Sequence, residues 1–291
     1  MKLKGRYAVI TGANQGFGEQ IARGFVREGA GLLICARDGK RLESVRQSLE
    51  AAGNAGQKIV AMTADVTRED DVRAVVKRAL QEFPQVDILV NCAGVAGPRG
   101  TIDSVNWEEW KQAIRINLDG TVFACLSFLP HMKSRRAGKI INISGGGATK
   151  PLPQLSAYAA SKAGVVRFTE TLAHEVRDFG IDVNAVSPGV LATRMVDHFL
   201  EVGAETLGQK YVDEVRRQKA DGQDSFDLAV NLCVYLASAQ SDGITGRLIS
   251  AAWDPWQDLH THREELAASD IYTLRRIVPE DRGATWGKVS R

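Results

Sequence analysis

The sequence has no marked excess of charge of either sign and no long apolar run. Its 37 basic and 35 acidic side chains leave a formal net charge of +2, so we expect no nucleic-acid partner, because such binding needs a basic surface. No run approaches the roughly 20 apolar residues of a membrane span, and the apolar start of the chain is too short for a signal peptide. A cytoplasmic protein without membrane contact is therefore expected.

Cysteine and histidine are few, and their spacing indicates neither a disulfide framework nor a metal centre. The four cysteines show no CxxC or ligand spacing and stand beside small or apolar neighbours, which indicates reduced core residues. His260 and His262 have no acidic or cysteine partner at ligand spacing. We expect no metal.

The sequence does have enough apolar residues for a full core, since 44% of its 291 residues are hydrophobic and 25% are charged. The apolar residues follow alternating strand and helix patterns. Strand-like runs occupy residues 7–11, 32–36, 59–63, 88–91, 139–144, 182–187 and 247–250. Helical periodicity marks residues 17–29, 41–52 and 68–83. This alternation favours the α/β class: a doubly wound, Rossmann-like parallel sheet with its ligand crevice at the carboxyl ends of the strands.

Two segments interrupt the alternation. Residues 191 to about 224 are rich in charge and follow a strand, so they could cover the crevice as a lid. We assign residues 1–252 to one catalytic domain and residues 253–291 to a C-terminal extension. The extension could be a solvated tail, an arm packing on another subunit or a wall of the substrate pocket, and Trp253 and Trp256 make complete disorder the least favoured interpretation.

A glycine-rich turn follows the first strand and opens the first helix. Its GxxxGxG spacing permits a tight turn and brings backbone N–H groups near a pyrophosphate. Glycine-rich turns also occur for purely steric reasons, but the strand–turn–helix context favours dinucleotide binding. The expected contacts are Gly12, Asn14, Gln15, Gly16, Phe17 and Gly18.

A tyrosine and a lysine lie four residues apart in a helical segment. Tyr158 and Lys162 therefore project from one helix face. A lysine ammonium beside a phenol favours the phenolate and brings the phenol toward a useful acid/base range. Alone, such a pair is more often a surface contact, and the upstream glycine turn is what favours a catalytic interpretation.

The chain resembles the short-chain dehydrogenase/reductase family, because further motifs follow the glycine turn in that family's order over about residues 5 to 250. The matching residues are Asp65 and Val66 after the third strand, Asn91, Ala93 and Gly94 in an NCAG segment similar to NNAG, Asn117, Tyr158 and Lys162 in YxxxK, and Pro188, Gly189, Val190 and Thr193 in PGxxxT. The resemblance implies cofactor contacts at these positions, except at Asn117, which corresponds to the family's active-site asparagine. It also implies that NADPH delivers hydride to a carbonyl carbon while Tyr158 protonates the oxygen. Lys162 would hold the nicotinamide ribose, and Asn117 would support a proton relay through water.

One position departs from the family pattern. The family's carbonyl-polarising serine stands thirteen residues before the tyrosine, where this chain has Gly145. Either Ser144 reaches the carbonyl, or Thr149 or a water replaces the missing hydroxyl. We favour Ser144 as a catalytic residue, although it could merely end the strand.

The end of the second strand bears on the choice of cofactor. Arg37 offers a bidentate cation for a 2′-phosphate where an acid would bind the ribose hydroxyls of NAD. Asp38 is adjacent and could partly neutralise Arg37. NADP(H) is therefore preferred, and NAD(H) stays possible.

The leading hypothesis is an NADP(H)-dependent oxidoreductase that acts on a carbonyl or secondary alcohol of a small or medium organic substrate. The alternatives are a non-catalytic or regulatory dinucleotide-binding protein, and an epimerase or dehydratase that uses bound nicotinamide. Residues 120–132 and 159–172 are too apolar for helices with a fully wet face. We therefore expect a homodimer or homotetramer in which these helices are covered.

Overall fold

The strand-like runs of the sequence form a single sheet. The computed structural model describes residues 1–191, 204, 209–220 and 223–286. Within these residues, seven parallel strands pair in the order β3-β2-β1-β4-β5-β6-β7. They are β1 (Tyr7–Thr11), β2 (Gly31–Ala36), β3 (Ile59–Thr63), β4 (Ile88–Asn91), β5 (Gly138–Ile143), β6 (Ile181–Ser187) and β7 (Leu248–Ser250). Each boundary lies within one residue of its predicted position, and the prediction of a doubly wound α/β fold is confirmed.

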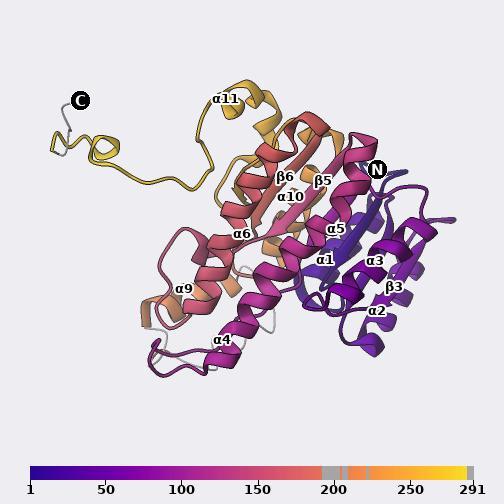
Figure 1. Ribbon diagram of the computed structural model, residues 1–291, viewed down its shortest axis with the longest axis horizontal. Helices are drawn as coiled ribbons and strands as arrows, with labels where there is room; N and C mark the ends of the chain where they lie inside the picture. Colours follow the sequence, from indigo (N-terminus) through magenta and orange to yellow (C-terminus); the bar gives the residue numbers. More distant parts are fainter. Residues whose placement is uncertain (192–203, 205–208, 221–222, 287–291) are drawn as a thin grey trace.

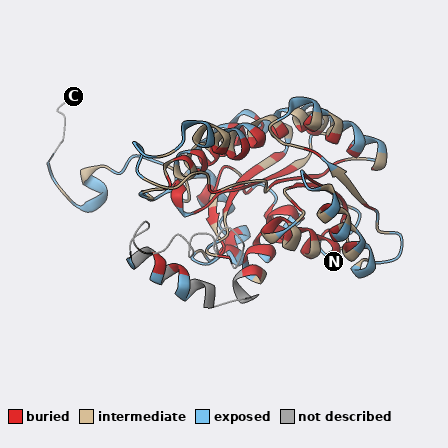
Figure 2. Cartoon of the chain, turned by 90° about the horizontal axis from the view of Figure 1, so that it is seen from below, coloured by how far each residue is buried: buried red, intermediate tan, exposed pale blue. Residues whose placement is uncertain are grey.

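Helices cover both faces of this sheet (Figure 1). One face carries α1 (Gly16–Arg27), α2 (Gly39–Ala52) and α10 (Gln223–Ala237), and the other carries α3 (Glu69–Glu82), α5 (Gly120–Arg135) and α6 (Ser156–Glu175). Alternate strand residues point to opposite faces, so Ala8 and Ile10 of β1 join the first core cluster while Val9 joins the second. Figure 2 shows buried residues concentrated in the sheet and on the inner faces of the helices.

A long, continuous helical segment brings the predicted site residue Asn117 to the carboxyl ends of the strands. It consists of α4 (Trp107–Ile114), the π-helical turn η1 (Arg115–Asp119) and α5, which follow one another without a break. The π turn contains Asn117, which is fully buried, and the Thr121 hydroxyl donates to the Asn117 carbonyl oxygen at 2.9 Å. Such turns interrupt the regular helix and are frequent at functional sites.

The C-terminal extension begins as part of the core. Trp256, Leu259 and Leu266 are each at most 6% exposed and join the cluster beneath α1 and α10. The remaining elements are α9 (Gln209–Ala220), α11 (Arg263–Ala268) and the short 3₁₀ turns η2 (Gly146–Ala148), η3 (Arg177–Phe179), η4 (Ala239–Ser241), η5 (Trp256–Thr261) and η6 (Pro279–Arg282). Among the described residues, no helix has the length and apolarity that crossing a membrane requires.

Candidate active site

A cleft of about 1430 Å³ opens at the carboxyl ends of the strands. It lies where the strand order reverses between β1 and β4, the position at which doubly wound sheets bind ligands. This volume exceeds the roughly 300–1,000 Å³ of an ordinary small-molecule pocket. The predicted residues that line it are Gly12, Asn14, Gln15, Gly16, Phe17, Gly18, Arg37, Asp65, Val66, Ala93, Gly94, Ser144, Tyr158, Lys162, Pro188, Gly189 and Val190.

The glycine turn forms one end of the cleft. A Cβ atom on Gly12 would lie 2.7 Å from the Cα atom of Ala93, and one on Gly18 would lie 2.3 Å from the carbonyl oxygen of Gly12. Gly12 and Gly16 also have positive φ angles, of 69° and 58°. No side chain caps the start of α1 at Gln15, so the first-turn N–H groups are available to an anion. The residues present therefore fit a dinucleotide pyrophosphate.

Basic residues gather beside this turn, at the end of β2. Asp38 is the N-cap of α2 and accepts a hydrogen bond from the backbone N–H of Arg41 at 3.0 Å. The Arg41 guanidinium donates to Oε1 of Gln15 at 2.6 Å, and both arginines, Arg37 and Arg41, line the cleft. The Asp38 carboxylate is thus engaged by the helix start, and a second cation that the sequence analysis missed stands beside Arg37.

Asp65 and Val66 form the adjoining wall after β3. One carboxylate oxygen of Asp65 accepts hydrogen bonds from the backbone N–H and the hydroxyl of Thr67, at 2.9 and 2.8 Å. These local bonds fix the loop at the start of α3. Val66 packs so closely on α5 that a Cβ atom at Gly120 would lie 2.8 Å from its side chain.

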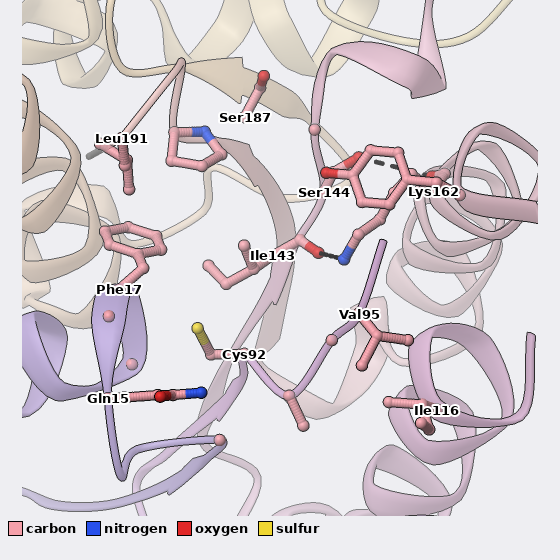
Figure 3. A pocket seen from close by; sticks show the side chains of 18 of the residues that line it. Gln15, Phe17, Cys92, Val95, Ile116, Ile143, Ser144, Lys162, Ser187 and Leu191 are labelled. Carbon is pink, nitrogen blue, oxygen red and sulfur yellow. Dashed lines mark hydrogen bonds between the residues drawn. The ribbon is translucent and has the colours of Figure 1, made fainter. Parts of the chain in front are cut away.

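Tyr158 and Lys162 lie one helical turn apart on α6, and both line the cleft. The Lys162 ammonium donates to the carbonyl oxygen of Ile143 at 2.7 Å, as Figure 3 shows, and lies 5.8 Å from the centroid of the Tyr158 ring. Lys162 is 5% exposed, and burial lowers its pKa from 10.5 to about 8. A pKa of about 8 still leaves Lys162 mostly protonated near pH 7, and the carbonyl at the end of β5 holds this ammonium in place.

Asn117 is fixed beside this pair. Its amide oxygen accepts a hydrogen bond from the backbone N–H of Val95 at 2.8 Å, and its amide nitrogen donates to the Val95 carbonyl and to the Ser161 hydroxyl, each at 2.9 Å. A Cβ atom on Gly94 would lie 3.3 Å from the Asn117 amide oxygen and 3.6 Å from the Lys162 ammonium. The side chain of Asn117 thus anchors the loop after β4 to α6, and the relay assigned to it stays a prediction.

Gly145 lies directly against the tyrosine. A Cβ atom at this position would be 2.3 Å from the Tyr158 hydroxyl oxygen and 3.2 Å from Cζ of its ring. Ser144 is 2% exposed, and its hydroxyl donates to the Lys162 carbonyl oxygen at 3.5 Å. The hydroxyl of Ser144 is thus engaged with the backbone of α6, and its predicted role toward a substrate stays a prediction.

One predicted cofactor residue, Asn91, lies in the core and not at the cleft. Asn91 is 3% exposed and does not line the cleft, because its amide donates to Cys125 at 3.3 Å and to Asn142 at 2.9 Å within the core. Asn91 thus links β4 to β5 through buried side chains. Thr193 and much of the lid expected between residues 191 and 224 lie outside the described residues.

The sequence analysis assigned no role to several residues that line the cleft. Arg41 could have been found from its position one turn after Arg37. Cys92, expected in the core, points into the cleft (Figure 3), but burial raises its pKa to about 12, so its thiol stays protonated. Within the described part of the chain, no group of three or more His, Cys, Asp or Glu side chains is arranged to hold a metal ion.

Comparison with known proteins identifies the family. Residues 6–201 match the model of the short chain dehydrogenase family. Over 193 residues, 66% of this chain and 72% of the relative, the chain is 37% identical to the 2,3-dihydro-2,3-dihydroxybenzoate dehydrogenase of Bacillus subtilis (strain 168).

Two solved structures share the fold over most of the chain. The 3-ketoacyl-(acyl-carrier-protein) reductase from Brucella melitensis, complexed with NADH, has a TM-score of 0.74 and 32% identity over 85% of this chain and 97% of that one. A gluconate 5-dehydrogenase from Burkholderia cenocepacia J2315, in complex with NADP and tartrate, has a TM-score of 0.75 and 28% identity over 86% and 94%. The chain belongs to the short-chain dehydrogenase family. It is an oxidoreductase for carbonyl or alcohol groups.

Proposed function

We propose that this protein interconverts a carbonyl group and a secondary alcohol with NADP(H) as the redox partner. The observation that carries the proposal is the placement of Tyr158 and Lys162 in the cleft that begins at the glycine turn. The dinucleotide, bound along that turn, supplies or accepts the hydride. Fixed positioning of the acid/base group relative to the bound reactants accounts for much of the expected rate enhancement.

The tyrosine exchanges the proton with the substrate oxygen. Its hydroxyl lies against Gly145, just after β5, and Tyr158 lines the cleft. The buried Lys162 ammonium stabilises the phenolate form and holds the nicotinamide ribose. Asn117 holds the loop after β4 in position and supports the proton relay, while Ser144 orients the substrate oxygen.

The preference for NADP(H) rests on the residues at the end of β2. Arg37 and Arg41 provide two cations for a 2′-phosphate, and Gln15 orients the second. The Asp38 carboxylate keeps its charge but is directed at the start of α2, where it accepts a hydrogen bond from the backbone N–H of Arg41. One of the similar structures contains NADH and another contains NADP, so these side chains are what supports the preference for NADP(H).

The substrate is a carbonyl compound of medium size with a largely apolar body. Beyond Tyr158, the cleft wall consists mainly of Pro151, Leu152, Pro153, Leu155, Val190, Leu191, Val215 and Trp253. Lys150 adds one cation to this end, where a polar or anionic substituent would be favoured. This composition directs a screen toward cyclic ketones, aromatic ring alcohols and short ketoacyl compounds, with and without a carboxylate.

A substrate panel followed by NADPH absorbance tests the function. Turnover with at least one carbonyl compound, and its reversal with the corresponding alcohol and NADP⁺, is expected. Product analysis separates net oxidation or reduction from epimerisation or dehydration, because only the former changes the NADPH concentration in proportion to product. Binding of dinucleotide without turnover on any member would favour the regulatory alternative.

The protein functions as a homodimer or homotetramer joined through α5 and α6. Leu126 on α5 is 54% exposed, and Phe123 is half-buried beside it. The outer positions of α6 include the small residues Ala160 and Ala163, which permit close approach of another helix. Covering these side chains removes apolar surface from water. Light scattering at micromolar concentration should give a multiple of the chain mass of 31.6 kDa, and a monomer would contradict this assignment.

A further inference from the structure

The C-terminal extension is divided at Leu274 into a docked part and a projecting part. Arg247, which stands just before β7 and is 7% exposed, holds the docked part in place. Its guanidinium donates to the carbonyl oxygens of Ser269 and Ile271 at 3.1 and 2.7 Å, and to that of Leu266. The backbone N–H of Leu248 donates to the Tyr272 carbonyl at 2.8 Å. These bonds cover the open edge of β7 with the protein's own chain.

The last attachment to the body is at α6. The backbone N–H of Leu274 donates to the Glu170 carboxylate at 2.6 Å, and its carbonyl oxygen accepts a bond from Arg167. The Leu274 side chain packs against the small cluster of Ala148, Val166 and Ala185. The chain therefore leaves the body beside one of the two helices proposed to join subunits.

Residues 275–286, which we call the arm, stand away from the body in Figure 1, where they form the yellow segment near the C-terminus. Among the described residues, the hydrogen bonds and ion pairs of the arm have their partners within the arm itself or at Asp270. Arg275 donates two bonds to the Asp281 carboxylate, at 2.7 and 2.9 Å, and that carboxylate also accepts from the Val278 backbone N–H at 2.8 Å. Gly283, with a φ of 70°, ends the turn η6.

The arm combines this local order with exposed apolar side chains. Ile277 is 60% exposed and Trp286 is 74% exposed. A solvated tail is typically polar and needs no fixed turn, whereas a segment already held in one conformation loses less entropy when it binds. Two large exposed apolar side chains beside a preformed turn are the features of a docking segment.

We propose that the arm packs against a second copy of this chain. This inference rests on the homo-oligomer proposed above, because the arm leaves the body beside α6, and a copy paired on α5 and α6 lies next to the base of the arm. Docking onto the arm's own subunit would require the chain to turn back at Leu274. The backbone N–H and carbonyl of Leu274 are both hydrogen-bonded to side chains of α6, which fixes the direction of the chain there. In a two-fold dimer the contact occurs twice, so each copy both gives and receives an arm.

The first test compares the full chain with a chain that ends after Leu274 and so keeps the docked part. A second variant combines Ile277→Ser and Trp286→Ser in the full chain, and Ile102→Ser, at a residue 66% exposed and outside the arm, is the matched control. Sedimentation velocity over a dilution series measures the dissociation constant. We expect the dissociation constant to rise by at least about 100-fold for both arm variants, because each variant removes two large apolar side chains from each of the two contacts. Ile102→Ser should leave the dissociation constant unchanged.

The second test locates the arm directly. Trp286→p-benzoylphenylalanine, irradiated in the assembled protein, should give a cross-linked species of twice the chain mass. Cross-links confined to single chains would overturn the proposal, as would a truncated chain that assembles as tightly as the full chain. In that last case the subunit pairing through α5 and α6 would stand, whereas a monomeric full chain would refute both.

Discussion

Gly145→Ala should impair catalysis through a single contact. A Cβ atom at this position would lie 2.3 Å from the Tyr158 hydroxyl oxygen, whereas ordinary contacts begin at 3.4 Å. The φ of Gly145 is 178°, which any residue adopts, so backbone strain contributes nothing. The tyrosine ring must therefore move by about 1 Å, and displacements of that size cost up to about 10²-fold in rate. We expect kcat to fall by about 10- to 100-fold, equivalent to about 1.4–2.7 kcal/mol of activation free energy.

The neighbouring glycine supplies the control. A Cβ atom on Gly146 would meet nothing within 4 Å, so Gly146→Ala should keep nearly full activity. Initial rates over a range of substrate and NADPH concentrations, with thermal unfolding of each variant, separate an effect on the tyrosine from one on stability. Full activity of Gly145→Ala would show that the Tyr158 ring moves aside without loss of function and would refute the steric argument. Greater activity of Gly145→Ser than of the natural protein would show that the natural site lacks a useful hydroxyl and that the Tyr158 ring can move aside.

Three further predictions follow from the same cleft. Tyr158→Phe should lower kcat by about 10²- to 10⁴-fold with little change in NADPH affinity, whereas Lys162→Ala should lower both, and an active phenylalanine variant would overturn the mechanism. Arg37→Ser and Arg41→Ser should each weaken binding of NADPH more than that of NADH in calorimetric titrations, and equal losses for the two cofactors would remove both arginines from the 2′-phosphate site. The pKa of Lys162, about 8 in the folded protein against 10.5 ordinarily, means that the unfolded chain binds this proton more tightly. The contribution of Lys162 to the free energy of unfolding should therefore rise between pH 8 and 10.5, by at most about 3 kcal/mol. Urea unfolding of Lys162→Met should lack that rise, and parallel pH profiles of the two proteins would count against a buried ammonium.

The fold could be predicted because its signals are local. Each strand is an apolar run bounded by turn residues, and periodicity marks the helices between them, so strand boundaries came within one residue and the ends of α1, α2 and α3 within two. The glycine turn was predictable for the same reason, since Gly12 and Gly18 permit backbone contacts that any side chain would block. Tyr158 and Lys162 share a helix face by spacing alone.

Other features depended on contacts between residues distant in sequence. Asn91 resembled a cofactor residue in its motif, yet pairing of β4 with β5 directs its amide to Asn142, 51 residues away. The partners of Asp38 and Arg41 likewise follow from how α2 begins and where Gln15 stands. A motif fixes which residue occupies a position, but not which buried donor or acceptor that side chain must satisfy.

The α/β class, the strand positions and the shared helix face of Tyr158 and Lys162 could be predicted from the sequence alone, because spacing along a helix or strand sets which side chains share a face. Only the tertiary structure decided that Gly145 lies against Tyr158, that burial lowers the pKa of Lys162, and that the C-terminal extension is docked as far as Leu274 and then leaves the body. These properties depend on distances and desolvation across the folded chain, and neither quantity exists until the elements have packed together.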